Sequence, residues 1–474
     1  MKLPQIQTRL DWSAYDSTSG GFDSFGGFDS FGGFDSGGDT QVAGGAYGKA
    51  VAVCTGKRQC QRNDNQVMCP SFRVTHHEKH STQHRAATLL AALNGEYGTQ
   101  PFIGAELAEA MELCVGCKGC KRECPNGVDM ALLRTEALAQ RWIARGSIPL
   151  RERLFAYMPH YAMHLKRLNW IASLRTPLIA RAMQTWLGIA ARRSLPKAAT
   201  RDFLSSATPQ QAQTNAREVV LLVDTFSNHL DPQIAEAALD VLQSAGYTVH
   251  IARAASGDRP LCCGRTFLSN GLIDEARAEA ARLIDALLPY VERKLPVIGL
   301  EPSCLLMLRD EYHALGLGEH VSAVAGSALL LEEFLAREQN AGRLQLPLKP
   351  LAEKMLVHGH CHQKAFGAMD AMRKVLALVP ELQVEYIESS CCGMAGSFGM
   401  EAEHYDVSMQ MGELTLFPKV RAASSDTRVV ANGTSCRHQI RDGAQRESQH
   451  LAQVLQLALD KNRRDNRIDR DCKS

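Results

Sequence analysis

The stretch that decides the fold is Cys114-Val-Gly-Cys117-Lys-Gly-Cys120-Lys-Arg-Glu-Cys124-Pro125. Its C-x2-C-x2-C-x3-C-P spacing lets three thiolates reach the corners of one [4Fe–4S] cluster, while the fourth points toward a neighbouring cluster. A structural zinc site is the alternative, but zinc favours paired C-x2-C hooks with a longer spacer and seldom has the Cys-Pro ending. The run therefore predicts an iron–sulfur protein with two clusters.

A second group of cysteines lies upstream and ends in Cys69-Pro70. If the two groups exchange their last ligands, as this spacing predicts, two ligand sets result. The sets are Cys69, Cys114, Cys117 and Cys120 for one cluster, and Cys54, Cys60 and Cys124 for the other. The second set is one cysteine short. It fits a [3Fe–4S] cluster, a [4Fe–4S] cluster with a non-cysteine or exchangeable ligand, or a degenerate site.

Length and composition limit the class of protein. A chain of 474 residues with 45% hydrophobic content suits three or four domains. Its 15 cysteines cluster at metal spacings and no signal peptide precedes them, so we expect a reducing cytoplasm. No apolar run reaches the roughly 18 residues of a spanning helix, so any membrane contact is expected to be peripheral, at the inner face. The net charge of +2 gives no nucleic-acid signature.

The first half of the chain divides into three segments. Residues 1–48 include a Gly-Gly-Phe-Asp-Ser-Phe repeat too poor in aliphatic residues to build a core, and are expected to be a disordered leader. Residues 49–145 are expected to form a helical ferredoxin-type module. Residues 146–215 are a basic helical connector: 151–197 hold nine Lys or Arg against one acid, Glu152. With its interleaved aromatics this segment fits an interfacial helix on anionic lipid, but linking helices with a solvated basic face, or a surface for an acidic partner, weigh more.

From about residue 216 the pattern becomes α/β, with short β-branched runs that alternate with helices. Strands are expected at 219–224, 247–252, 297–301, 355–360, 384–388 and 428–432, and apolar helices at 328–336 and 450–459. Cys-Cys-Gly occurs at 262–264 and 391–393, and Ser-Cys at 303–304 and 435–436. We therefore predict two duplicated parallel α/β domains, at 216–347 and 348–460, followed by a frayed tail at 461–474. Their chemistry is expected in loops at the strand ends.

These domains carry a second cysteine system. Adjacent cysteines suit a sulfur cluster better than one tetrahedral ion, because neighbouring thiolates can reach different irons. The second α/β domain offers four thiols, those of Cys361, Cys391, Cys392 and Cys436. The first α/β domain offers three, those of Cys262, Cys263 and Cys304. The first half has Asp224 near the position where the second has Cys361. Either the first half has lost its metal, or the halves face each other and share one site.

Three histidines, His358, His360 and His362, surround Cys361. On a continuous strand they would share one face, although a turn would break that alternation. Capping the strand or supporting the cysteines is the default interpretation. His360 and His362 are also candidates for a catalytic role, as metal ligands or as proton donors to a substrate.

Six motifs together resemble the iron–sulfur half of FAD-linked 2-hydroxyacid dehydrogenases, a family that includes glycolate oxidase and anaerobic glycerol-3-phosphate dehydrogenase iron–sulfur subunits and D-2-hydroxyglutarate dehydrogenase-like fusions. Heterodisulfide reductase is a more distant relative. The motifs are CVGCKGCKRECPNGVDM at 114–130, RPLCCGRTF at 259–267, LEPSCLLMLRDE at 300–311, VHGHCHQKA at 357–365, CCGMAGSFG at 391–399 and NGTSCRHQIRD at 432–442. Where relatives tend to carry Arg-Gly, this chain has Gln83-His84 before Arg85. Arg85 either serves a substrate carboxylate or braces a cluster.

The resemblance implies an electron-transfer component whose FAD domain is absent from this chain, so that either a separate FAD-binding oxidase subunit supplies electrons or the chain is a truncated descendant of a fusion. The electrons would pass through [4Fe–4S] clusters to quinone or another acceptor. The runner-up is a thiol–disulfide reductase with a non-cubane cluster at the Cys-Cys-Gly motifs, and a third interpretation is a redox-sensing or assembly protein.

Overall fold

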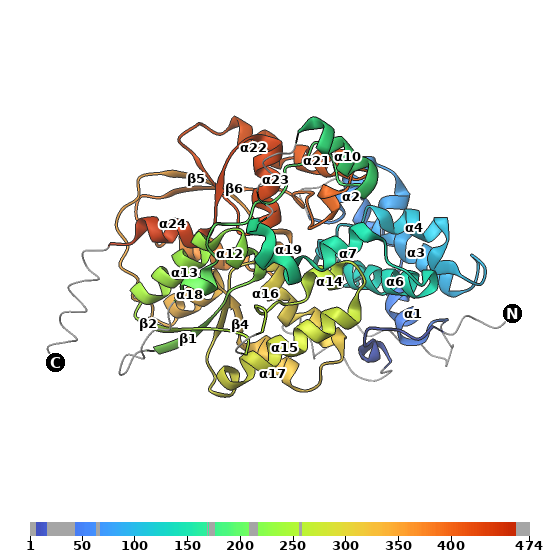
Figure 1. Ribbon diagram of the computed structural model, residues 1–474, viewed down its shortest axis with the longest axis horizontal. Helices are drawn as coiled ribbons and strands as arrows, with labels where there is room; N and C mark the ends of the chain where they lie inside the picture. The colour runs from blue at the N-terminus through green and yellow to red at the C-terminus, as the bar shows by residue number, and fades with distance from the viewer. Residues whose placement is uncertain are drawn as a thin grey trace.

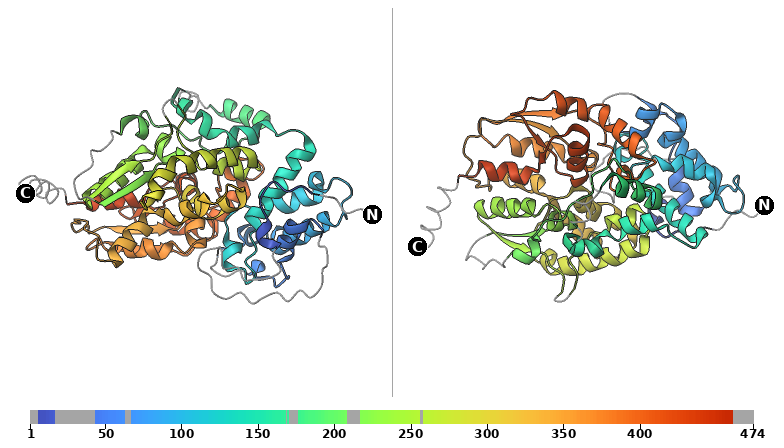
Figure 2. Two further views of the ribbon diagram at one scale, coloured as in Figure 1. Left: turned by 90° about the horizontal axis from the view of Figure 1, so that it is seen from below. Right: turned by 45° about the horizontal axis from the view of Figure 1, so that its top comes forward.

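The computed structural model describes residues 6–16, 43–62, 67–167, 169, 176–207, 217–255 and 258–460. Three parts surround a common centre: a helical module, drawn blue to cyan, a first α/β domain in lime to yellow, and a second in orange to red (Figure 1). The views of Figure 2 show the helical module beside both α/β domains. The glycine-rich repeat and the predicted tail lie outside the described residues.

The prediction of a disordered leader over residues 1–48 is wrong at two places: helix α1 (Gly45–Ala52) already begins within it, and residues 6–16 pack into the core. This segment carries the 3₁₀ turn η1, Ser13–Tyr15, and buries Leu10 and Trp12 to 3% exposure each. The Glu136 carboxylate accepts hydrogen bonds from the Leu10 backbone N–H at 2.8 Å and from the Trp12 indole at 3.3 Å. Leu10 and Trp12, residue types that the repeat lacks, place this part of the leader in the core.

The helical module follows the prediction of helices set between cysteines. Its elements are α1 (Gly45–Ala52), η2 (Gln59–Gln61), α2 (Pro70–Thr75), η3 (Glu78–His80), α3 (Thr82–Leu93), η4 (Pro101–Ile103), α4 (Ala105–Glu112), α5 (Gly119–Glu123) and α6 (Met130–Arg145). Ser81 and Asp129 cap α3 and α6, because their side chains accept the otherwise unpaired N–H groups of His84 and Leu132. The caps fix where each helix begins relative to the cysteine loops.

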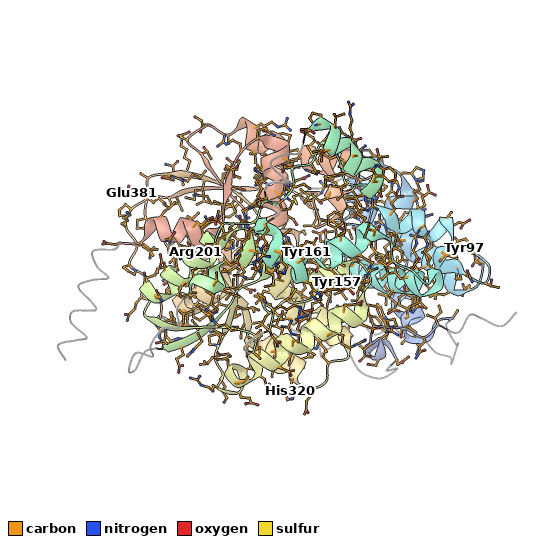
Figure 3. All side chains as sticks on the ribbon, viewed as in Figure 1. Tyr97, Tyr157, Tyr161, Arg201, His320 and Glu381 are labelled. Carbon is orange, nitrogen blue, oxygen red and sulfur yellow. The ribbon has the colours of Figure 1, made fainter. Side chains whose placement is uncertain are left out.

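The connector crosses the face where the three parts meet. It contains α7 (Leu150–Ala156), α8 (Met158–Tyr161), η5 (Ala162–His164), α10 (Pro177–Leu187) and α11 (Phe203–Ser206). Figure 3 places Tyr157 and Tyr161 near the centre of this face, far from Tyr97 in the helical module and from Glu381 in the second domain. A backbone bridge between Ile189 and Glu401 ties the connector to the second domain.

Each α/β domain is built on a four-stranded parallel sheet, with order β2-β1-β3-β4 in the first and β6-β5-β7-β8 in the second. The strands are β1 (Arg217–Leu222), β2 (Tyr247–Ile251), β3 (Val297–Gly299), β4 (Ala328–Leu330), β5 (Lys354–His358), β6 (Gln383–Ile387), β7 (Arg428–Val430) and β8 (Ser448–Gln449). Because helices cover both faces, strands such as β1 are apolar and buried over most of their length, here from Val219 to Leu222. Counted from the first strand of each domain, both sheets have the order second, first, third, fourth, so the two domains share one sheet topology.

Six strands match the predicted ones to within a few residues, but β4 and β8 were not predicted. The helix expected at 328–336 begins only at Leu331, because 328–330 pair with β3. Strands of two or three residues are too short to show a periodicity in the sequence.

Helices complete both domains. They are α12 (Thr225–His229), α13 (Pro232–Ser244), α14 (Arg265–Ser269), α15 (Ile273–Glu292), α16 (Pro302–Arg309), η6 (Glu311–Leu315), α17 (His320–Ser327) and α18 (Leu331–Asn340) in the first, and α19 (Cys361–Ala365), α20 (Met369–Leu376), η7 (Phe398–Met400), α21 (Tyr405–Glu413), α22 (Leu416–Ala422), α23 (Thr434–Ala444) and α24 (Leu451–Ala458) in the second. None of the helices in the described ranges is long and apolar enough to cross a membrane.

The two α/β domains pack directly on each other. The Thr434 backbone N–H donates to the Glu301 carboxylate at 2.8 Å, and Arg437 pairs with Asp231 at 2.7 Å. The first contact joins the start of α23, after β7, to the segment after β3, and the second joins α23 to the residue before α13. The carboxyl ends of the two parallel sheets therefore meet near the helical module, which is where the loops that carry the cysteines lie.

Candidate metal centres

Four cysteines of the helical module surround one small cavity, and they are the set predicted from ligand exchange: Cys69, Cys114, Cys117 and Cys120. Cys69 immediately precedes α2, and Cys120 lies in the first turn of α5. The start of α5 lies close to the segment that carries Cys69, since a Cβ on Gly119 would lie 3.0 Å from the Met68 backbone nitrogen. A small cavity lined by four thiols fits an iron–sulfur cluster.

The charge around this cavity also fits a cluster. Burial raises the pKa of the Cys117 and Cys120 thiols, so they need a bound metal to become thiolates. Against the effect of burial, the Arg85 guanidinium and the Ser71 hydroxyl lower the pKa of Cys69. Arg85 is 1% exposed and donates to the Cys69 sulfur at 3.3 Å and to Ser71 at 2.8 Å. The structure therefore places Arg85 as a brace for the cysteine cavity.

The shorter cysteine set lies nearer the surface. Cys54 and Cys124 are half-buried and Cys60 is buried. Burial, with a smaller contribution from nearby Cys124, raises the pKa of Cys54. The Asn126 amide donates to the Val53 carbonyl at 2.7 Å, which holds the loop of Cys54 beside the end of the cysteine run. Residues 63–66, between Cys60 and Cys69, lie outside the described residues.

In the second α/β domain, the four predicted cysteines converge from three strand ends. Cys361 begins α19, Cys391 and Cys392 follow β6, and Cys436 lies in α23 after β7. The ligand atoms of His358, Cys392 and Cys436 lie within 4.8 Å of one another, and all three residues are buried. The other ring nitrogen of His358 is hydrogen-bonded to the Ser389 hydroxyl at 2.9 Å. His358 is thus a potential ligand that the sequence analysis did not single out.

The ionisation of this group suits a soft metal. A hydrogen bond from Cys391 lowers the pKa of the Cys361 thiol to about 6, and hydrogen bonds from Cys391 and Cys436 lower that of Cys392. Burial lowers the pKa of His358 to about 4, so its imidazole is neutral at neutral pH and can offer a lone pair. Thiolates with a neutral imidazole are ligands for zinc, iron and iron–sulfur clusters.

The first α/β domain brings Cys262, Cys263 and Cys304 together but adds no free fourth ligand among the described residues. Asp224 caps α12: one carboxylate oxygen accepts the Phe226 and Ser227 N–H groups at 2.9 and 3.0 Å, and the other accepts the Ser227 hydroxyl at 2.7 Å. Hydrogen bonding to Cys263 and burial raise the pKa of Cys262. The pKa is raised for all three thiols of this domain, whereas in the second domain it is lowered for Cys361 and Cys392 and raised for Cys391 and Cys436.

The three histidines do not share a face, because β5 ends at His358 and the chain then turns into α19. His360 caps that helix through its Nδ1, which accepts the His362 N–H at 3.1 Å. His362 reaches into the helical module, where its Nε2 lies 3.2 Å from the Gly116 carbonyl oxygen. The default interpretation of capping applies to His360, and His362 links the two cysteine systems.

The two cysteine systems meet. Cys117 packs in one apolar cluster with Val67, Cys361 and Cys391. The Ser390 hydroxyl donates to the Val67 carbonyl, and α5 lies against α19. The cavity of the helical module and the cysteine group of the second domain are thus direct neighbours.

A buried network of charges accompanies this junction, and the sequence analysis missed it. Lys118 is 2% exposed and pairs with Asp129 at 3.0 Å, with Asp310, and with Glu311 at 3.2 Å. Glu311 also pairs with Arg265 at 2.6 Å. The only signal was a lysine inside a cysteine run, which gives no indication of acids about 190 residues away.

Comparisons with known proteins agree with these centres. The model of the 4Fe-4S dicluster domain matches residues 49–128, and that of the cysteine-rich domain matches residues 355–441. One of the subunits of anaerobic glycerol-3-phosphate dehydrogenase from Escherichia coli (strain K12) is 30% identical over 278 residues, which are 56% of this chain and 66% of that protein. The predicted iron–sulfur content is confirmed.

Two further relatives cover more of the chain. D-2-hydroxyglutarate dehydrogenase of Escherichia coli (strain K12) is 25% identical over 85% of this chain and 43% of its own length. The glycolate oxidase iron-sulfur subunit of the same strain is 23% identical over 83% of this chain and 91% of its own length. The chain thus spans 66% and 43% of the first two relatives, and the resemblance seen in the motifs is confirmed.

Proposed function

We propose that this chain, an iron–sulfur protein with homologues among dehydrogenase subunits, is the electron-transfer component of an FAD-linked dehydrogenase. Its substrate would be a 2-hydroxyacid of the glycolate, D-lactate or D-2-hydroxyglutarate type, or glycerol 3-phosphate. One observation carries the proposal: Cys117 of the helical module packs directly against Cys361 and Cys391 of the second α/β domain. Two metal-binding cysteine groups in contact serve electron transfer better than two isolated structural sites.

The cavity lined by four thiols supports the first of the two ligand sets predicted from the sequence. We assign Cys69, Cys114, Cys117 and Cys120 to one [4Fe–4S] cluster, and Cys54, Cys60 and Cys124 to the second, of the [4Fe–4S] or [3Fe–4S] type. When bound, such clusters accept and release one electron at a time. The residues of the chain hold the cluster ligands, keep water from the buried set and, through Arg85, place a positive charge beside it.

The second α/β domain is the better candidate for a further cluster or metal. Cys361, Cys391, Cys392 and Cys436 would supply thiolates, with His358 as a fifth donor. The identical strand order of the two sheets supports a duplication in which the first copy kept Cys262, Cys263 and Cys304 without a free fourth ligand among the residues described. In this proposal the first copy is mainly scaffold.

The partners belong to the same proposal. A separate FAD-binding subunit would deliver electrons near Cys54 and Cys124, which are the half-buried cysteines of the shorter set. Quinone or another acceptor would take them. We place the chain in the cytoplasm, in peripheral contact with the inner face of the membrane, in keeping with its free thiols and basic connector.

A thiol–disulfide reductase is the second candidate. It is favoured by Cys361, Cys391 and Cys392 lining a cavity of about 1210 Å³, large enough for a disulfide substrate. The incomplete set around Cys262 weakens it, because paired clusters in both halves would serve a two-electron cleavage better.

The deciding experiment is anaerobic purification, followed by iron and sulfide analysis and EPR of the oxidised and reduced protein. About eight irons with coupled [4Fe–4S] signals would fit two clusters in the helical module, and about twelve would add one in the second domain. Cys436→Ser should lower the iron content only in the second case, while Cys304→Ser should leave it unchanged. A preparation that binds zinc and no sulfide would overturn the electron-transfer proposal.

A further inference from the structure

The two halves of the helical module repeat each other in sequence and in structure. Helix α1, Gly45–Ala52, and helix α4, Ala105–Glu112, both have eight residues. Each position of α1 lies 60 residues before its counterpart in α4, and each helix leads directly into a cysteine loop. The loops at 54–60 and 114–120 can therefore be compared residue by residue.

The comparison of the two loops locates the missing cysteine. Cys54-Thr-Gly-Lys57-Arg-Gln-Cys60 aligns without a gap on Cys114-Val-Gly-Cys117-Lys-Gly-Cys120. The first and third cysteines of the second loop have counterparts in Cys54 and Cys60, but its middle cysteine has Lys57 as its counterpart. The C-x5-C spacing is thus that of a C-x2-C-x2-C cluster loop in which the middle ligand is replaced.

The backbone agrees with this alignment. Gly56 and Arg58 have φ of +74° and +54°, and their counterparts Gly116 and Lys118 have φ of +59° and +60°. Positive φ is uncommon for residues other than glycine, so its recurrence at Arg58 and Lys118 shows that the two loops follow the same path. In each loop this residue directly precedes the short helix that carries the third cysteine, η2 or α5. The loop of Lys57 is therefore folded as a cluster loop.

The third cysteine of each loop has equivalent neighbours. The start of α3 lies against Cys60, and the Gln83 backbone N–H donates to the Cys60 sulfur at 3.4 Å. The start of α6 lies in the same way against Cys120, whose sulfur accepts a hydrogen bond from the Met130 backbone N–H. Backbone N–H groups in the first turn of a helix stabilise a thiolate and the cluster that it holds. Cys60 thus has the surroundings of a cluster ligand.

The three thiols of the shorter set lie close enough to share one cluster. Burial raises the pKa of Cys54 and of Cys60. The negative charge of the Cys124 thiolate adds to this increase at Cys54, and those of Cys69 and Cys54 add to it at Cys60. A bound cluster offsets such repulsion between neighbouring thiolates. The three cysteines therefore fit a cluster and leave one of its corners to be filled from another source.

Residue 57 lies at the surface, unlike its counterpart. Lys57 and the adjacent Arg58 are exposed. Cys117, by contrast, is 8% exposed and packs with Cys361 and Cys391 of the second α/β domain. The same corner of the two cluster loops thus faces solvent in one case and the protein interior in the other.

We propose that the cluster of Cys54, Cys60 and Cys124 has an open iron corner at residue 57, which takes an exchangeable oxygen ligand from solvent in place of a protein side chain. The inference rests on the proposed electron-transfer function and adds the place and the kind of the missing ligand. An iron without a protein ligand is held less firmly than the other three. When the [4Fe–4S]²⁺ cluster gives one electron to an oxidant, it should release this iron as Fe²⁺ and become [3Fe–4S]⁺, and one Fe²⁺ with one electron restores it.

Iron release measures the open corner without turnover. The anaerobically purified full chain is treated with a small excess of ferricyanide, which takes the electron, and is followed by EPR and a ferrous-iron assay. We expect about one iron released per chain and the signal of an oxidised [3Fe–4S] cluster, both reversed by ferrous ion with dithionite. Lys57→Cys supplies the missing thiolate and should reduce iron release about tenfold.

The matched control is Gln59→Cys. It adds a thiol to the same loop at the counterpart of Gly119, a position that holds no ligand, and should release iron as the wild type does. Equal iron release from Lys57→Cys and the wild type would move the open corner away from residue 57 and overturn the placement.

The solvent ligand is tested against the amine of Lys57 itself. Lys57→Ala should release iron at the wild-type rate, whereas a rate about tenfold higher would assign the corner to the lysine amine and overturn the solvent ligand. Water enriched in the magnetic oxygen isotope gives a direct readout. It should broaden the EPR signal of the reduced second cluster in the wild type and in Lys57→Ala, but not in Lys57→Cys. No broadening in the wild type would overturn the proposal even if Lys57→Cys failed to assemble its clusters.

The failure of this inference differs from the failure of the proposed function. A wild-type chain that keeps all its iron in ferricyanide, with the signals of two [4Fe–4S] clusters, would refute only the open corner, because a protein side chain would then fill it. A chain with no iron–sulfur signal at all would refute the function itself.

Discussion

At the scale of single residues, Arg85 shows how one buried charge serves a cysteine cavity. Its guanidinium is held by the Ala110 carbonyl at 2.8 Å and by Ser71, and so is fixed beside the Cys69 sulfur. A positive charge next to a cluster favours the reduced form, which carries one more negative charge. Sequence reasoning left the role of Arg85 open between a substrate carboxylate and a brace, and the contacts favour the brace.

Replacing this charge should change the reduction potential. Arg85→Leu is expected to lower the midpoint potential of the cluster by roughly tens of millivolts, because the reduced form loses its nearest cation. An EPR-monitored redox titration measures it, with Lys374→Leu on the exposed side of α20 as control. An unchanged potential in Arg85→Leu, with full iron content, would contradict the proposed ligand set around Cys69.

At the scale of elements, the two Cys-Cys-Gly turns depend on a close backbone approach. Gly393 has φ of +92°, and a Cβ there would lie 2.3 Å from the Ser408 carbonyl oxygen. Gly264 has φ of +87°, and its Cβ would lie 2.8 Å from the Ala276 carbonyl oxygen. In each domain, a helix after the turn thus packs against the glycine and fixes the direction of the two cysteines before it. Both turns therefore use glycine for the same reason.

Gly393→Ala should therefore be strongly destabilising. We expect a loss of about 2–4 kcal/mol, because the clash is with backbone and φ is unfavourable for alanine. Thermal unfolding followed by circular dichroism gives the comparison. Gly326→Ala in α17, where nothing lies within 4 Å, should be neutral or raise stability by about 1 kcal/mol. Equal melting temperatures for the two variants would show that the turn can relax.

At the scale of the whole molecule, a buried acid lies between the α/β domains. Glu332 of α18 is 1% exposed and accepts hydrogen bonds from Gln363 and from Asn432, the latter at 3.3 Å. Burial raises the pKa of this carboxyl to about 7. The folded protein therefore binds a proton more tightly than the unfolded chain, whose carboxyl has an ordinary pKa of about 4.3.

The sign of the pH dependence follows. The contribution of Glu332 to stability is fully present below about pH 4 and is lost as pH rises through 7, by about 4 kcal/mol in all. Glu332→Gln should remove this part of the decline, so that its melting temperature exceeds that of the wild type at pH 8 but not at pH 5. Glu236→Gln, on the exposed side of α13, is the control. A constant difference between variant and wild type at both pH values would refute the buried-proton argument.

The sequence by itself determined the iron–sulfur module and the parallel α/β domains, and it predicted the grouping of Cys69 with Cys114, Cys117 and Cys120, which line one cavity. These depend on local spacing and periodicity, which the chain carries within a few dozen residues. It left capping of the strand or support of the cysteines as the default role of the three histidines, and in the structure His360 caps helix α19.

Only the tertiary structure decided the rest. The contact between Cys117 and Cys361, the pairing of Lys118 with Asp310, and the packing of Trp12 on Glu136 join residues more than a hundred positions apart. No local pattern encodes such contacts, because they arise from how the three parts pack. The cavity of about 1210 Å³ also depends on tertiary packing, because the connector, the cluster loops and both α/β domains each supply part of its wall.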